Sequence, residues 1–113
     1  MKNQQKRLYE GMYILSASLS EDALKKALSR ITDLIEEHGG EIHKIHEQGR
    51  KKLAYEINGH KQGNYYLLYF SVIPSAIAEM WKEYHLNEDL IRFITLQAEK
   101  IVEKIEFQPL PEA

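Results

Sequence analysis

The sequence predicts an α+β protein with a ferredoxin-like fold, in which a split βαβ pattern forms a four-stranded antiparallel sheet with two helices on one face. Three observations lead to this prediction. The chain has 113 residues, which is the size of one compact domain. Its apolar residues alternate between strand-like and helix-like spacing in the order βαββαβ. Right-handed crossovers then favour the strand order 4-1-3-2, with the first and third strands central.

A central strand and a helix are predicted in the first third of the chain. Residues 8–15 include apolar residues at both odd-numbered and even-numbered positions, which is typical of a strand covered on both faces. Beyond Ser20 the spacing changes to period 3.6. The helical stripe consists of Leu24, Ala27, Leu28, Ile31, Leu34 and Ile35. Ser20 is a suitable N-cap, and Gly39 after His38 is a suitable terminator, so both helix ends are marked.

Two strands are predicted in the middle of the chain. Residues 41–57 alternate again, and Gly49 interrupts the alternation, which predicts one long, bent strand. A turn at residues 58–63 leads to residues 65–73, which are apolar at nearly every position. We therefore expect residues 65–73 to form the second central strand.

A short helix and a last strand complete the pattern. Pro74 is acceptable at a first helical position. The apolar stripe that follows consists of Ile77, Met80, Trp81 and Tyr84. Residues 90–96 then give the fourth strand. We expect residues 1–99 to form the domain and residues 100–113 to form a C-terminal tail.

The composition excludes several classes of function. The 43% hydrophobic and 28% charged content is that of an ordinary globular protein, and the formal net charge of −2 gives no global attraction to phosphate. There is no cysteine for a disulfide, a thiolate metal site or a nucleophile. His43 and His46, three apart on a strand, should point to opposite faces, so we expect no metal or other cofactor. The polar N-terminus predicts no signal or membrane helix, so a cytoplasmic protein is expected.

The sheet face that the helices leave uncovered is predicted to be partly apolar. The third strand presents there either Tyr66, Leu68, Phe70 and Val72, or Tyr65, Leu67 and Tyr69. The first strand presents either Met12 and Ile14, or Tyr13 and Leu15. Exposed apolar patches of this kind mark binding surfaces. Either a partner buries this face, or the tail and the loops cover it.

The long second strand is also basic, and we expect part of its edge to be open. Its cations are Lys44, Arg50, Lys51 and Lys52. Such an edge can accept a partner strand or contact phosphate. Alternatively, the lysines protect the edge from aggregation.

Three segments resemble the bacterial small-subunit ribosomal protein six family. They are Leu8-Tyr9-Glu10, residues 49–57 (GRKKLAYEI) and residues 86–93 (LNEDLIRF). The resemblance implies a structural constituent of the small ribosomal subunit with no enzymatic activity, no cofactor and no small-molecule substrate. It also implies binding to the central domain of the small-subunit rRNA together with ribosomal protein eighteen as heterodimer partner.

The uncovered face, the basic edge and the resemblance together suggest two sets of site residues. Those expected to bind rRNA are Arg7, Lys44, Arg50, Lys51, Lys52 and Arg92. Those expected to bind the partner are Tyr9, Met12, Ile14, Tyr66, Leu68, Phe70 and Ile94. Arg92 occupies the arginine of the family's fourth-strand motif and should lie on the open face, where it meets phosphate or a carboxylate, or else pairs with Glu10. Tyr9 either stacks on a base or partner or belongs to the core.

Other functions on the same fold fit the sequence less well. An acylphosphatase-like hydrolase needs arginine and glycine in the loop after the first strand, and residues 16–19 contain neither. An RNA-recognition-motif-like module that binds single-stranded RNA would place aromatic residues on the first and third strands, but residues 63–69 match its signature only weakly. A regulatory dimer that binds a small metabolite is a third alternative. RNA binding without a partner favours the module, and RNA binding only with a basic partner favours the ribosomal protein.

Overall fold

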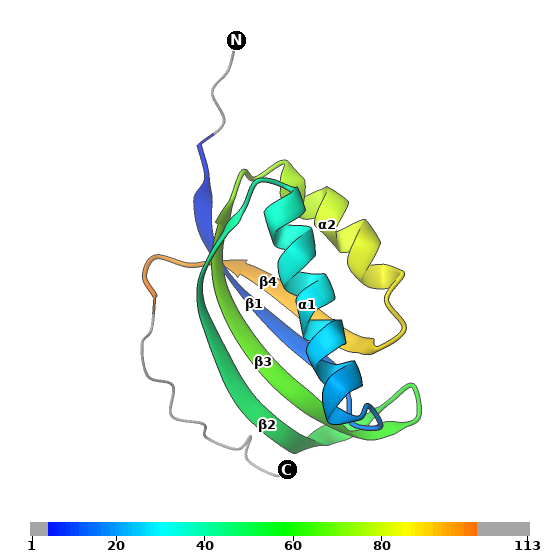
Figure 1. Cartoon of the computed structure of the whole chain (residues 1–113). Coiled ribbons are helices and arrows are strands. Elements are labelled where there is room, and N and C mark those ends of the chain that lie inside the picture. The colour runs from blue at the N-terminus through cyan, green and yellow to red at the C-terminus, as the bar shows by residue number, and fades with distance from the viewer. Residues whose placement is uncertain (1–4, 102–113) are drawn as a thin grey trace.

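In the computed structural model, which describes residues 5–101, a four-stranded antiparallel sheet carries two helices on one face (Figure 1). The elements are β1 (Arg7–Ser16), α1 (Glu21–Glu37), β2 (Glu41–Ile57), β3 (His60–Val72), α2 (Ala76–His85) and β4 (Leu90–Gln97). The strand order β2-β3-β1-β4 is the predicted order read in the opposite direction. The predicted fold is thereby confirmed. Most of the predicted tail, residues 102–113, lies outside the described residues.

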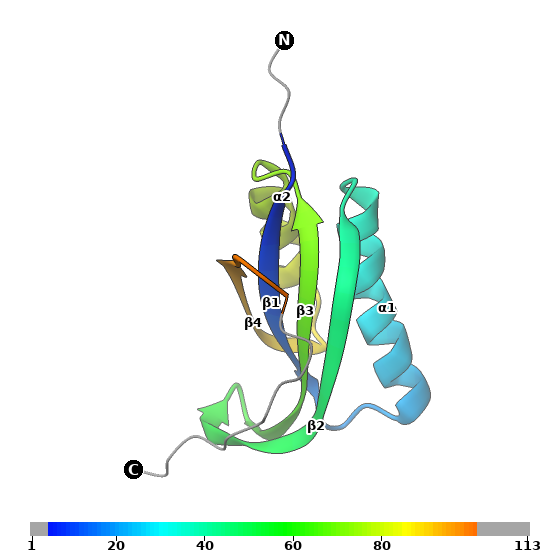
Figure 2. The same cartoon turned by 90° about the vertical axis from the view of Figure 1, so that its left-hand side faces the viewer.

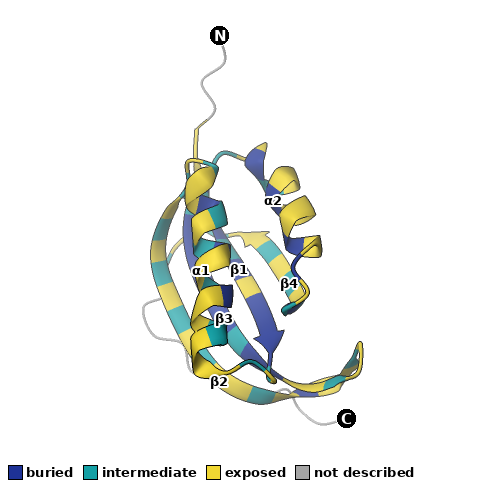
Figure 3. Cartoon of the chain, turned by 45° about the vertical axis from the view of Figure 1, so that its right-hand side comes forward, coloured by how far each residue is buried: buried dark blue, intermediate teal, exposed yellow. Residues whose placement is uncertain are grey.

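The hydrophobic core lies between the sheet and the helices. From β1 it takes the odd-numbered residues Tyr9, Tyr13 and Leu15, and from β3 the even-numbered residues from 66 to 72. Buried residues gather on these central strands, whereas exposed residues alternate along β2 and β4 (Figure 3). On each central strand, therefore, one set of alternate residues faces the helices, and the other set faces away from them.

Helix α1 begins and ends where the sequence predicts. The Ser20 hydroxyl accepts a hydrogen bond from the Ala23 amide at 3.2 Å, as expected of an N-cap. The helix is capped at its other end by His38, and Gly39 follows with φ of 77°, a conformation that favours glycine. Its buried residues are Ala27, Ile31 and Ile35, all members of the predicted stripe.

Helix α2 is shorter, and one member of its predicted stripe is exposed. Ala76, Met80 and Tyr84 follow one another at intervals of four and face the core. Trp81 stands next to this row and is 43% exposed. Its ring instead packs edge-on against Phe93 of β4, with 5.3 Å between the ring centroids. Trp81 is therefore a member of the predicted apolar stripe that packs on β4 and is not part of the buried core.

The connection between β2 and β3 is tighter than predicted. Ile57 is opposite His60, and the two residues between them, Asn58 and Gly59, have φ values of 47° and 84°. Positive φ at both positions is typical of a type I′ hairpin turn. The predicted turn at residues 58–63 was too long because the strands continue as an arm beyond the rest of the sheet (Figure 2). Polar residues are accommodated in this arm because water reaches it.

Gly11, an unusual residue for a central strand, makes room for a neighbouring side chain. A Cβ atom at this position would lie 2.6 Å from the hydroxyl of Tyr13 and 2.7 Å from its ring. The Tyr13 ring is fully buried, and its hydroxyl is hydrogen-bonded to that of Tyr84 at 2.8 Å. Glycine is therefore required here for the packing of the core.

Candidate functional site

The strand register determines which side chains lie on the open face, the side of the sheet without helices. Residues directly opposite each other in neighbouring strands share a face. Arg92 of β4 is opposite Ile14 of β1, which is opposite Tyr65 of β3. The residues on the open face of β1, β3 and β4 include Met12, Ile14, Tyr65, Leu67, Tyr69, Arg92, Ile94 and Leu96.

Four residues expected to contact a partner belong instead to the core on the helix side. These are Tyr9, Tyr66, Leu68 and Phe70, which are 9%, 6%, 0% and 0% exposed. Their placement is corrected accordingly. The sequence did not show which side of β3 faces the helices, because β3 is apolar on both of its sides. In the structure the helices cover its even-numbered residues. Tyr9 is thus a core residue whose ring stacks against Phe70.

The open face offers a narrow apolar stripe along β1 and β4. Met12, Ile94 and Leu96 are 37%, 39% and 55% exposed. Ile14 shares their face but is only 6% exposed, so little of it is available for contact. We call Met12, Ile94 and Leu96 the apolar stripe. It contains two of the predicted partner-binding residues, and Leu96 extends it.

Arg92 lies at one end of this stripe and is linked to the hairpin arm. Its Nη1 donates a hydrogen bond to the hydroxyl of Tyr55 at 2.6 Å. Tyr55 is 63% exposed and lies on β2, at the opposite edge of the sheet from β4, so the contact spans the sheet. Glu10 is opposite Leu96 in the register and therefore lies far along the strand from Arg92. The alternative ion pair between Arg92 and Glu10 is not formed.

A second tyrosine lies close to the same guanidinium. Partial burial raises the pKa of Tyr65, and the positive charge of Arg92 acts in the opposite direction. Arginine with an exposed tyrosine ring, here that of Tyr55, is a combination suited to nucleic acid, because a guanidinium meets phosphate and an aromatic ring stacks on a base. Tyr55 was not among the predicted site residues, although it belongs to the GRKKLAYEI segment that carries the resemblance.

The predicted basic residues do not form one patch. Lys44 is opposite Tyr69 and Lys51 is opposite Gly63, which places both on the open face with Arg92. Desolvation lowers the pKa of Lys51. The remaining predicted cations are opposite even-numbered residues of β3, whose side chains lie on the helix side of the sheet. These cations are Arg7, Arg50 and Lys52. Arg50 donates from Nη2 to the carbonyl of Ala17 at 2.8 Å, so it also holds the loop between β1 and α1.

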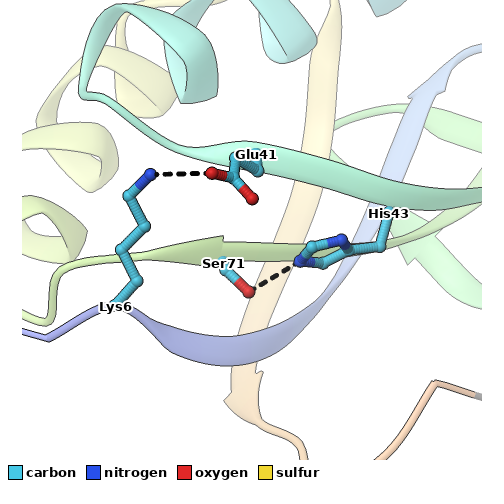
Figure 4. A network of polar contacts seen from close by, with 4 residues as sticks. All are labelled: Lys6, Glu41, His43 and Ser71. Carbon is cyan, nitrogen blue, oxygen red and sulfur yellow. Dashed lines mark hydrogen bonds and ion pairs between the residues drawn. The ribbon is translucent and has the colours of Figure 1, made fainter.

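Polar contacts occupy the far end of the open face (Figure 4). His43 Nε2 is hydrogen-bonded to the Ser71 hydroxyl at 2.7 Å, and Lys6 forms an ion pair with Glu41 at 3.1 Å. A bulge at His43 shifts the register of β2 by one residue, so the alternation of its side chains between the two faces is interrupted there. His43 and His46 therefore both face the open side. The expectation that these histidines point to opposite faces was wrong. Within residues 5–101 there is no group of three or more side chains that could hold a metal ion.

The fold and the open face define a class: a ferredoxin-like binding protein whose sheet offers apolar, cationic and aromatic contacts rather than catalytic groups. Comparison with known proteins gives the family. The family model described as ribosomal protein S6 matches residues 8–97. The small ribosomal subunit protein bS6 of Protochlamydia amoebophila is 61% identical over 112 residues, which cover 99% of this chain and 98% of that protein. The protein of the same name from Chlamydia caviae is 59% identical over 112 residues and is covered completely, at 100%.

A solved structure agrees with these relatives. The crystal structure of 30S ribosomal protein S6 from Thermotoga maritima matches with a TM-score of 0.78 and 29% identity, over 83% of this chain and 89% of that one. The chain belongs to the ribosomal protein S6 family and is a structural, non-enzymatic constituent of the small ribosomal subunit. Its place is the ribosome in the cytoplasm. In the described part of the chain, no helix is long and apolar enough to cross a membrane.

Proposed function

We propose that the chain binds the central domain of the small-subunit rRNA as a heterodimer with ribosomal protein eighteen, and that the open face makes both contacts. The observation that carries this proposal is the position of the apolar stripe beside the Arg92–Tyr55 contact. One half of this surface suits a protein and the other half suits RNA. Membership of the family supports assembly into the small subunit, and the resemblance of the sequence implies both partners.

The apolar stripe is assigned to the protein partner. Met12, Ile94 and Leu96 are large, apolar and exposed, and the register places Met12 directly opposite Ile94. Apolar side chains at the centre of an interface stabilise association because they leave water on binding. A partner on this stripe also lies next to Arg92, so protein and RNA can be bound side by side.

The rRNA is assigned to Arg92, Tyr55 and the open-face lysines. Arg92 is exposed and can meet phosphate oxygens while the Tyr55 ring stacks on an unpaired base. Lys44 and Lys51 lie on the same face. The whole chain has a formal net charge of −2, so its attraction to RNA is local. A basic partner is expected to supply the remaining positive charge.

The alternative RNA-recognition-motif-like module is not favoured by the geometry. Such modules stack bases on aromatic residues of their central strands. In β1 the aromatic residues Tyr9 and Tyr13 face the helices, and the open face carries Glu10 and Met12. On β3, Tyr69 faces the open side but is only 2% exposed, and Tyr65 on the same side is partly buried. The surface for stacking on the central strands is therefore small.

A binding assay with and without the partner tests the proposal. Filter binding of an rRNA central-domain fragment should be weak for this chain alone and tight for the heterodimer, with affinity that falls steeply as salt increases. Tight binding of single-stranded RNA by the chain alone would favour the module instead.

Replacement of Arg92 by glutamate tests the RNA-binding surface. Arg92→Glu reverses a charge that faces RNA, so we expect at least about tenfold weaker binding of the heterodimer to rRNA, with unchanged folding. Lys25→Glu makes the same charge change on the exposed side of α1 and is the matched control. Equal affinities of the two variants would remove Arg92 from the interface.

A further inference from the structure

The two edges of the sheet differ in their protection against an added strand. At one edge, β2 has three register irregularities in its pairing with β3 and carries many charged side chains. At the other edge, β4 contains a single charged residue, Arg92, and its pairing with β1 is regular from Tyr9 to Ile14. Bulges and charges are common ways in which proteins protect edge strands. Since β4 has few of these features, it is the less protected edge.

Backbone hydrogen-bonding groups point outward from β4. The Ala98 amide donates to the Leu8 carbonyl at 2.9 Å, which fixes the phase of the ladder between β4 and β1. In an antiparallel ladder, hydrogen-bonded pairs alternate with pairs that are not hydrogen-bonded. The even-numbered residues from 92 to 98 therefore direct their backbone groups toward β1. Phe93, Thr95 and Gln97 direct theirs away from the sheet, and in the described chain no strand lies beyond them.

We propose that a second copy of this chain adds to this edge, with β4 antiparallel to β4 about a twofold axis at Thr95. In this register Phe93 is opposite Gln97 of the second copy, and the two Thr95 residues are opposite each other. These are the outward-facing residues on both strands, so each such pair can exchange two hydrogen bonds. The arrangement is isologous, as expected of a symmetric dimer.

The side chains of β4 are compatible with the same register. Ile94 is placed opposite Leu96 of the second copy, and these side chains are 39% and 55% exposed in the single chain. Arg92 is placed opposite Ala98, and Glu99 opposite Ile91, so no like charges oppose each other. Apolar cross-strand pairs stabilise a sheet, whereas opposed like charges destabilise it. This self-complementarity identifies a second copy as the occupant.

A tryptophan at the same edge provides a signal for this association. Trp81 is the only tryptophan of the chain and is 43% exposed. It lies on the helix side of the sheet, edge-on to Phe93, which is one of the residues that pairs with the second copy. A strand added next to Phe93 therefore removes part of the Trp81 ring from water. Its emission should shift to shorter wavelength when the dimer forms.

The first test is the oligomeric state of the full chain as its concentration is raised. Sedimentation velocity should show a monomer–dimer equilibrium, and the Trp81 emission should shift over the same concentration range. Hydrogen exchange of the Phe93, Thr95 and Gln97 amides should slow together with dimer formation. A chain that stays monomeric at its solubility limit, or that dimerises without protecting these amides, would overturn the proposal.

Variants separate the edge from the open face, which the proposed heterodimer uses. Gln97→Pro removes an outward-pointing amide and leaves the ladder with β1 intact, whereas Gln97→Ala keeps the amide and is the matched control. The symmetric loss of two hydrogen bonds should weaken the dimer about twentyfold relative to the control. Met12→Lys changes the open face away from the β4 edge and should leave the dimer unaffected. Dimerisation that is lost in Met12→Lys but retained in Gln97→Pro would assign self-association to the face, whatever the outcome for the heterodimer.

Discussion

At the scale of single residues, Gly11 has the clearest structural role. Replacement of a strand glycine by alanine ordinarily stabilises a protein slightly, because the unfolded chain loses freedom. At Gly11 the new methyl group would lie 2.6 Å from the Tyr13 hydroxyl, and the ring it would displace is the largest fully buried side chain. We therefore expect Gly11→Ala to lower the free energy of unfolding by about 1–3 kcal/mol. Urea unfolding measures this, and an unchanged or raised stability would contradict the packing argument.

The buried pair of Tyr13 and Tyr84 should make the protein sensitive to alkaline pH. Burial raises the pKa of Tyr84 to about 12, and burial together with Tyr84 also raises the pKa of Tyr13. The folded state thus favours the neutral hydroxyl over the anion. The stabilisation is fully present below the unfolded pKa of about 10 and is lost as the pH rises from about 10 to about 12.

The expected loss from Tyr84 is about 3 kcal/mol over this range, since one pKa unit corresponds to about 1.4 kcal/mol. Guanidinium unfolding between pH 8 and the alkaline limit measures it. Tyr84→Phe is the control: it should be less stable at neutral pH, because the Tyr13 hydroxyl loses its partner, and its stability should depend less on pH. An equally steep pH dependence in Tyr84→Phe would assign the effect to other groups.

At the scale of elements, the hairpin arm of β2 and β3 brings Tyr55 to Arg92. The hydroxyl and the ring of Tyr55 have separate roles in the proposed site. Tyr55→Phe removes the hydrogen bond to Arg92, and because both side chains are exposed the stability should change by less than about 1 kcal/mol. Tyr55→Ala also removes the ring, whose stacking on a base is worth about 1–3 kcal/mol. Affinity for rRNA should therefore fall more in Tyr55→Ala than in Tyr55→Phe, and equal affinities would exclude stacking.

The elements show which parts of the structure local patterns can predict. Helix α1 was predicted in detail because its stripe, its N-cap and Gly39 agree with one another. The hairpin turn was predicted too long, although Asn58-Gly59 is a strong signal for a two-residue turn. The orientation of His43 depends on a bulge in the pairing of β2 with the far end of β3, near Tyr69, and this bulge has no mark in the local sequence. Local signals thus predict the elements better than the register between them.

The candidate site was predicted only in part, for the same reason. Ile94 and Arg92 were placed on the open face in agreement with the register, which also selects Met12 from the two alternatives left open for the first strand. Tyr66, Leu68 and Phe70 were not, because a strand that is apolar on both sides gives no sign of which side the helices cover. Tyr55 was missed because its contact with Arg92 joins residues 37 positions apart, on strands at opposite edges of the sheet.

At the scale of the whole molecule, the two layers have different tasks. The helix side closes the core, and the open side keeps cations, the exposed ring of Tyr55 and the apolar stripe accessible. The stripe lies outside the core, since its residues are absent from the core cluster. A protein that keeps exposed apolar residues outside its core is expected to bury them in a complex.

The last prediction follows from this division between the layers. Met12→Lys and Ile94→Lys place a charge in the proposed contact with ribosomal protein eighteen, where it would be buried without a partner on association. We expect either change to weaken the heterodimer at least about tenfold, which corresponds to about 1.4 kcal/mol or more. The unfolding free energy of the isolated chain should change by less than about 1 kcal/mol, because both positions are exposed. Leu86→Lys is the matched control: Leu86 is 74% exposed and follows α2 on the helix side. Calorimetric titration with the partner distinguishes these variants, and equal affinities for Met12→Lys, Ile94→Lys and Leu86→Lys would place the heterodimer contact outside the apolar stripe.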